Sequence, residues 1–200
     1  MSNKSDLVSI IRRTQTIVSV TLFLFTMLFC WQATDLELSK IQLSYWGGSD
    51  MKYGWLWNSI IVLLSISIAI NNILFVKRHT RLKYKTIPYI LFSIVSVSLL
   101  LVGLFNLEYD LLHDIPAWVY FFLYPLTIFT MAYLNRKILR YKEWFTHLIF
   151  SIVMIVVPLM CLTITEGFGL AEIVHSLTVI AWNVHTAFKR FDIHLATIKQ

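Results

Sequence analysis

The feature that most constrains this chain is a series of six apolar stretches, each about as long as a membrane-crossing helix. The hydrocarbon core of a bilayer is about 30 Å thick, and a helix needs roughly 20 apolar residues to cross it. The stretches cover residues 14–33, 55–76, 87–105, 116–135, 145–163 and 171–190. They predict an all-α fold, a polytopic bundle of six transmembrane helices that forms one integral membrane domain over residues 1–200.

The composition excludes several other classes of protein. Hydrophobic residues make up 58% of the 200 residues and charged residues only 14%, whereas a soluble domain carries roughly 25% charged residues. The mean hydropathy is +0.69. A water-soluble enzyme, a disordered tail and a nucleic-acid-binding domain are therefore poor interpretations, and we expect no nucleic-acid partner.

The basic residues predict the orientation in the membrane. If alternate connections lie on opposite sides, 15 of the 17 Lys and Arg residues fall on one side, and only Lys40 and Lys52 fall on the other. Eight of the 11 acidic residues accompany those two lysines. The positive-inside rule then places both termini in the cytoplasm. We expect a prokaryotic inner membrane protein whose net charge of +6 reflects topology rather than an anionic partner.

The first outer connection, residues 34–54, is the only long one. Its alternating apolar residues and Gly47-Gly48 fit either a small two-stranded excursion or an interfacial flap on the bundle. Cys30 and Cys161 fall near the outer ends of the first and fifth spans, so a disulfide would require these spans to touch. We expect two small apolar side chains instead.

Polar residues inside a membrane need partners, so they are the natural candidates for function. Glu172, His175, Ser176, Asn183 and Thr186 fall near one face of the sixth span. In the second span, Asn58, Ser65 and Asn72 recur every seven residues, which favours hydrogen bonds between helices. Glu108, Asp110, His113 and Asp114 precede the fourth span. If these segments converge, they form an outer pocket, for which the candidate residues are Asn58, His113, Asp114, Glu172 and His175.

Several chemistries remain open for such a pocket. It could bind a cationic headgroup, or polarise water as a metal hydrolase does. His113 and His175 are weak metal-ligand candidates, but HExxH is absent, so we expect no metal and no cofactor. A basic inner connection is a candidate site for anionic lipid headgroups, although simple topology-setting charge explains it more readily. Its residues are Lys77, Arg78, Arg81, Lys83 and Lys85.

Three stretches resemble a known family. LVGLFNLEYDLLHDIPAWVYFFLYPLTIFTMA (101–132), GLAEIVHSLTVIAW (169–182) and LSYWGG with YGWLWNS (43–59) are similar to a prokaryotic group known as domain of unknown function 998. The resemblance covers nearly the whole chain and departs from the pattern at Asn106 and Ala171, where a proline is usual.

This resemblance implies a six-span protein in the superfamily of Frag, DRAM and Sfk-like proteins, which are linked to lipid-anchor remodelling, autophagy and lipid organisation. It also implies a set of functional positions: Asn58, Gly103, His113, Pro125, Glu172 and Trp182.

We therefore expect a non-catalytic membrane protein that binds membrane lipids, or a partner membrane protein, through the outer pocket. An enzyme is the less favoured interpretation. The alternatives are a membrane-embedded lipid hydrolase or transferase that uses the outer His and carboxylate residues, and a small transporter.

Overall fold

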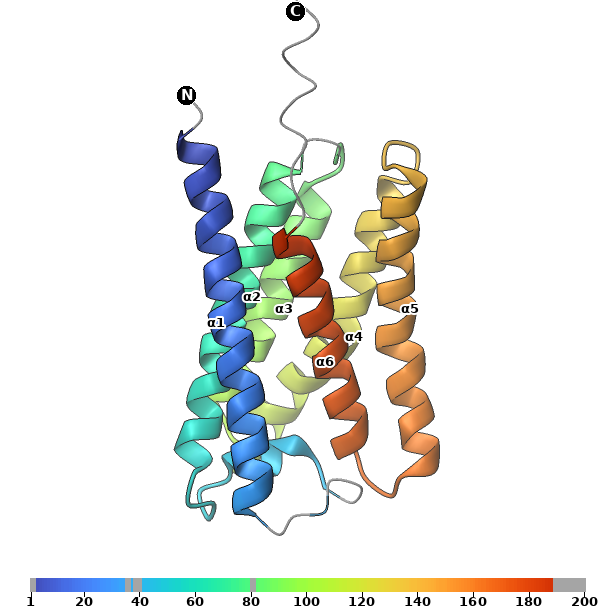
Figure 1. The fold of residues 1–200 in the computed structure, drawn as a ribbon. Helices are drawn as coiled ribbons and strands as arrows, with labels where there is room; N and C mark the ends of the chain where they lie inside the picture. The colour runs from blue at the N-terminus through green and yellow to red at the C-terminus, as the bar shows by residue number, and fades with distance from the viewer. Residues whose placement is uncertain (1–2, 35–36, 38–40, 80–81, 189–200) are drawn as a thin grey trace, which may run out of the picture.

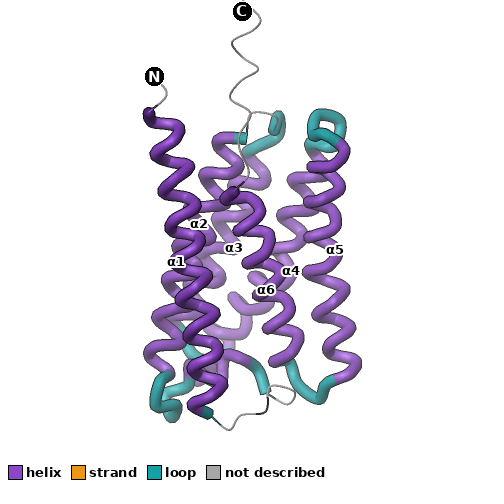
Figure 2. Tube along the Cα trace, in the orientation of Figure 1, coloured by secondary structure: helices purple, strands orange, loops and turns teal. Residues whose placement is uncertain are grey.

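All six apolar stretches form helices, and these helices run side by side in alternating directions (Figure 1). The computed structural model describes residues 3–34, 37, 41–79 and 82–188. The helices are α1 (Asn3–Ala33), α2 (Gly54–Arg78), α3 (Thr86–Leu104), α4 (Leu111–Leu134), α5 (Tyr141–Ile164) and α6 (Gly169–Phe188). Two short 3-10 helices, η1 (Leu43–Gly47) and η2 (Leu107–Tyr109), lie in the connections. No strand occurs in the described residues, so the all-helical prediction is confirmed (Figure 2).

Five of the helices, α1 to α5, are long and apolar enough to cross a membrane. Helix α6 is not among them. Its 20 residues include Glu172, His175, Asn183 and His185, which lower its hydropathy. Helix α6 nevertheless packs along α5, α1 and α2. Five helices of the described residues are thus candidate membrane spans by length and composition, and the sixth span stays a prediction.

The helices form a closed ring. Each contacts the next along the chain, α6 contacts α1, and α2 also contacts α6 across the centre. We call the end that carries η1, η2 and the start of α6 the η1 end. The opposite end, which carries the α2–α3 and α4–α5 connections, we call the basic end. The start of α1 and the end of α6 both lie at the basic end (Figure 1).

The start of α1 differs from the prediction. The sequence places the first span after Arg12-Arg13, but α1 begins at Asn3. Arg12 is fully buried, and its guanidinium donates hydrogen bonds to the Asn71 side chain (3.0 Å) and the Thr186 carbonyl (2.9 Å). A charged side chain with such partners can lie inside the bundle. The helix therefore continues through residues that hydropathy assigns to the connection.

A buried network of polar side chains joins four helices. Asn71 of α2 donates to the Asn183 side chain (2.9 Å) and to the Thr186 hydroxyl (3.0 Å) of α6. The Tyr124 hydroxyl of α4 accepts from Asn72 (2.9 Å) and Asn183 (2.6 Å). With Arg12 of α1, these contacts fix α6 in the ring, and hydrogen bonds of this kind are common between membrane helices.

Trp182 and Pro125, two positions implied by the family resemblance, lie in the packed interior. Trp182 is fully buried and stacks on Phe92 with ring centroids 5.4 Å apart. The Pro125 carbonyl accepts a hydrogen bond from the Ser151 hydroxyl (2.9 Å), which joins α4 to α5. The geometry gives both residues a packing role in the bundle.

The described residues of the long connection (34–54), which we call the flap, contain no strand. Its described part forms η1, in which Leu43 and Trp46 are buried against the bundle. Trp46 packs edge-on against Trp57 of α2 at 4.9 Å and donates to the Thr34 hydroxyl (3.1 Å). Leu36 and Leu38, part of the expected alternation, lie outside the described residues. Cys30 and Cys161 are buried free thiols.

Candidate functional site

His113 occupies the first turn of α4 and points into the bundle at the η1 end. The chain reverses at Asp110, whose φ is 41°, and α4 begins at the next residue. Only 3% of His113 is exposed, and its Nδ1 lies 2.6 Å from the Phe105 carbonyl oxygen. Because a carbonyl only accepts hydrogen bonds, Nδ1 must carry the proton. In the neutral ring, Nε2 is then a hydrogen-bond acceptor.

Glu172 occupies the first turn of α6 and holds the flap. Its carboxylate accepts a hydrogen bond from the backbone N–H of Leu43, at the start of η1. A carboxylate is also favoured at a helix N-terminus by the positive end of the helix dipole. This hydrogen bond joins two residues that are distant in the sequence at the η1 end of the bundle.

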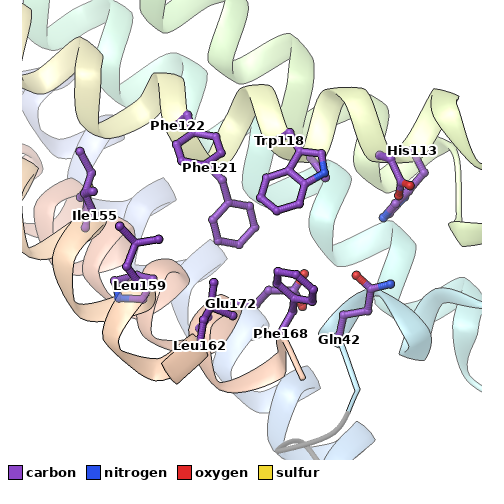
Figure 3. Close-up of a pocket in the computed structure, with 15 residues that line it drawn as sticks. Gln42, His113, Trp118, Phe121, Phe122, Ile155, Leu159, Leu162, Phe168 and Glu172 are labelled. Atoms are coloured by element: carbon purple, nitrogen blue, oxygen red, sulfur yellow. The ribbon is translucent and has the colours of Figure 1, made fainter. Parts of the chain in front are cut away.

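His113, Asp114 and Glu172 line one groove between α4, α5 and the start of α6 (Figure 3). The groove has a volume of about 260 Å³. Gln42 lies with His113 and Glu172 at its polar mouth, and the rest of the lining is apolar. The apolar residues are Ala117, Trp118, Phe121, Phe122, Met154, Ile155, Pro158, Leu159, Leu162, Phe168 and Ala171.

The groove opens to the side of the bundle. Trp118, Phe122 and Leu159 line it and are 49%, 55% and 49% exposed. A smaller cavity of about 70 Å³ shares four residues with it, among them His113 and Glu172, and extends toward α2. The structure thus places one apolar surface with a polar mouth at the η1 end.

Asn58 lines the smaller cavity and anchors the flap to α2. Its side-chain amide donates to the Gly47 carbonyl (2.9 Å). A Cβ at Gly47 would lie 2.2 Å from Asn58 Oδ1, which no side chain tolerates. The pairing of this glycine with this asparagine explains both residues in the LSYWGG and YGWLWNS segments.

His175 behaves differently from the other candidates, because it lines neither of these cavities. Its ring packs against Phe121 (4.4 Å between centroids) and Tyr120 (5.4 Å). Its Nδ1 lies 3.1 Å from the Met154 carbonyl oxygen. His175 therefore supports the groove wall formed by Phe121 and does not reach the mouth.

Glu108 in η2 and Asp114 in the first turn of α4 have different surroundings. Asp114 reaches the groove, whereas Glu108 binds the flap by accepting hydrogen bonds from the Ser49 hydroxyl and from the Ser49 backbone N–H (2.9 Å). These bonds favour the ionised carboxylate and lower the pKa of Glu108 below its ordinary value. Glu108 contributes to flap position rather than to the groove.

The described residues contain no group of three or more His, Cys, Asp and Glu side chains that could hold a metal ion. A catalytic zinc site commonly uses three protein ligands. The contacts that the structure gives for His113 and Glu172 are hydrogen bonds, to the Phe105 carbonyl oxygen and from the Leu43 N–H.

The basic residues that were candidate lipid contacts lie at the basic end, except Arg81, which is outside the described residues. Lys77 lies over the Tyr89 ring at 5.3 Å, and Lys83 lies over the Tyr84 ring at 5.5 Å. The Lys85 ammonium donates to the Lys77 carbonyl (3.1 Å), near the end of α2, which also carries Arg78. These contacts order the connection and leave the anionic-lipid site a prediction.

The fold and its apolar helices define a helical integral membrane protein with a lateral groove. The family model described as "Protein of unknown function (DUF998)" matches residues 16–189. The chain belongs to this family. Comparison with curated proteins and with solved structures found no match.

Proposed function

We propose that the protein binds a membrane lipid in the groove between α4 and α5 and has no catalytic activity of its own. The observation that carries this proposal is the shape and chemistry of the groove, which is apolar along its length, open to the side and polar at one end. A hydrocarbon chain can enter it directly from the bilayer, while a headgroup meets the polar mouth. A volume of about 260 Å³ suits a single chain better than a whole two-chain lipid.

The proposal includes six spans, cytoplasmic termini and a prokaryotic inner membrane, with the groove mouth on the outer side. The distribution of basic residues supports this orientation, because the basic end would face the cytoplasm. The proposal also includes the superfamily of Frag, DRAM and Sfk-like proteins that the resemblance implies, which would fit a lipid-related role. The hydrolase, transferase and transporter alternatives stay predictions, since no observation in the described residues favours them.

Filling the groove tests the proposal. Ala117 lines both cavities, and Trp118, Phe121 and Phe122, which follow it in α4, line the groove. We expect Ala117→Phe to lower the amount of lipid that copurifies with the protein several-fold, because the new ring occupies the space of the hydrocarbon chain. Native mass spectrometry of the detergent-solubilised protein measures this amount.

Ile115→Phe is the matched control. Ile115 lies in the same helix, is 57% exposed and lines neither cavity. This variant should retain the lipid of the unmodified protein. If Ala117→Phe folds, by its melting temperature and elution volume, and still retains the same lipid, the groove is not the binding site.

A further inference from the structure

We infer that the groove selects a lipid whose headgroup carries a protonated primary amine. This inference rests on the proposed function and specifies its ligand. The inference follows from the hydrogen-bonding groups at the mouth, because a hydrocarbon chain cannot form hydrogen bonds with them.

The mouth consists mainly of hydrogen-bond acceptors. One oxygen of the Glu172 carboxylate accepts the hydrogen bond from the Leu43 N–H, and the lone pairs of the other oxygen remain available. Asp114 adds a second carboxylate to the lining. An ionised carboxylate can only accept, so a ligand group that meets both must donate.

His113 supplies an independent acceptor. His113 is only 3% exposed, and its Nδ1 donates a hydrogen bond to the Phe105 carbonyl oxygen. Figure 3 shows the ring at the mouth, facing Gln42. The remaining Nε2 has no hydrogen-bond partner in the described part of the chain, and His113 lines both cavities. An acceptor that lines a cavity and has no protein partner can receive a hydrogen bond from a ligand or from water.

The charge of the lining also favours a cationic ligand group. Neither cavity is lined by a described Lys or Arg residue, whereas Glu172 lines both and Asp114 lines the larger. A headgroup with a net negative charge would face like charges in the mouth, while a cationic group at the end of a headgroup would be attracted. A primary ammonium carries one positive charge and three N–H donors, which matches two carboxylates and one imidazole nitrogen. A quaternary ammonium has the charge but no donor.

The test compares three phospholipids with identical acyl chains. The purified protein is incubated in detergent with equal amounts of dioleoyl phosphatidylethanolamine, phosphatidylcholine and phosphatidylglycerol, and native mass spectrometry measures which lipid is retained. We expect phosphatidylethanolamine to be retained about tenfold over either competitor, since one charge-assisted hydrogen bond corresponds to roughly that factor.

Two variants assign the selectivity to the mouth. Asp114→Asn and Glu172→Gln should each reduce the preference for phosphatidylethanolamine about three- to tenfold, because each replaces a carboxyl oxygen that accepts hydrogen bonds with an amide NH2 group that donates them. Asp114 is exposed and independent of the flap, so it remains informative if Glu172→Gln disturbs η1. Glu166→Gln is the control, since Glu166 is an exposed carboxylate at the same end that lines neither cavity.

The outcomes separate this inference from the proposed function. Equal retention of all three lipids, or preference for phosphatidylglycerol, overturns the amine selectivity and leaves lipid binding intact. Equal retention of phosphatidylcholine and phosphatidylethanolamine also overturns it, because charge alone would then suffice. Retention of no lipid by the unmodified protein overturns both.

Discussion

Buried polar residues decide how the centre of this bundle is assembled. The Tyr124 hydroxyl accepts two amide hydrogen bonds, one from α2 and one from α6, in a side chain that is fully buried. In the apolar interior, neither amide has water as an alternative partner. One oxygen atom therefore links three helices.

Removing that oxygen should destabilise the fold. We expect Tyr124→Phe to lower the free energy of unfolding by about 1–2 kcal/mol, because it leaves the Asn72 and Asn183 amides short of an acceptor. Unfolding in mixed micelles of increasing SDS content measures the change.

Tyr133→Phe is the control, since Tyr133 lies in the same helix and is 52% exposed. Its loss of a hydroxyl should change stability by less than about 0.5 kcal/mol. Equal effects of the two substitutions would show that the Tyr124 bonds contribute no net stability.

At the scale of elements, α2 and α3 approach each other closely at Gly103 of α3. A Cβ at Gly103 would lie 2.9 Å from Val62 Cγ2 and 3.0 Å from the Val62 backbone nitrogen. Backbone atoms cannot rotate away as a side chain can, so the helices would have to separate. Small residues serve this purpose widely in membrane helix pairs.

Gly103→Ala should therefore lower thermal stability, with a loss of about 1–3 kcal/mol, despite the higher helix propensity of alanine. The melting temperature in detergent measures the effect. Val97→Ala, at a position of α3 that is 54% exposed, should leave it nearly unchanged. A Gly103→Ala protein as stable as the unmodified one would show that this contact can relax freely.

At the scale of the whole molecule, the six helices return the chain to the end where it began (Figure 1). The start of α1 and the end of α6 lie together at the basic end. If all six helices span the membrane, as we propose, the positive-inside rule predicts that this end faces the cytoplasm.

Labelling with a membrane-impermeant maleimide tests this arrangement. We expect Asp50→Cys, in the exposed flap region, to react in intact cells, and Lys137→Cys, at the basic end, to react only after permeabilisation. A tag placed after Gln200 should also require permeabilisation. Accessibility of that tag in intact cells, with the other two results unchanged, would mean that α6 does not span the membrane.

Much of the fold was predictable because hydropathy is a local property. The second and third helices match their predicted spans within two residues at each end. Helix α4 begins five residues before its predicted start, because its first turn includes the polar His113 and Asp114. Windows of apolar residues do not detect a helical turn that is polar.

The candidate site was predictable only in part. The sequence suggested that the segments around His113 and Glu172 converge, and the structure brings these two residues to one groove. It gave no signal that His175 supports the wall or that Asn58 holds the flap through Gly47. Arg12 and Asn71 were missed entirely, because their partners lie on other helices.

The sequence by itself determined the helical class, the approximate spans and the concentration of basic residues at one end, since each follows from residues that are neighbours in the chain. The tertiary structure alone decided which polar side chains face each other, where the groove opens and which atoms remain available at its mouth. Those features depend on the rotation and register of packed helices. The rotation and register of each helix are determined by contacts among side chains that are distant in the sequence, so no single segment encodes them.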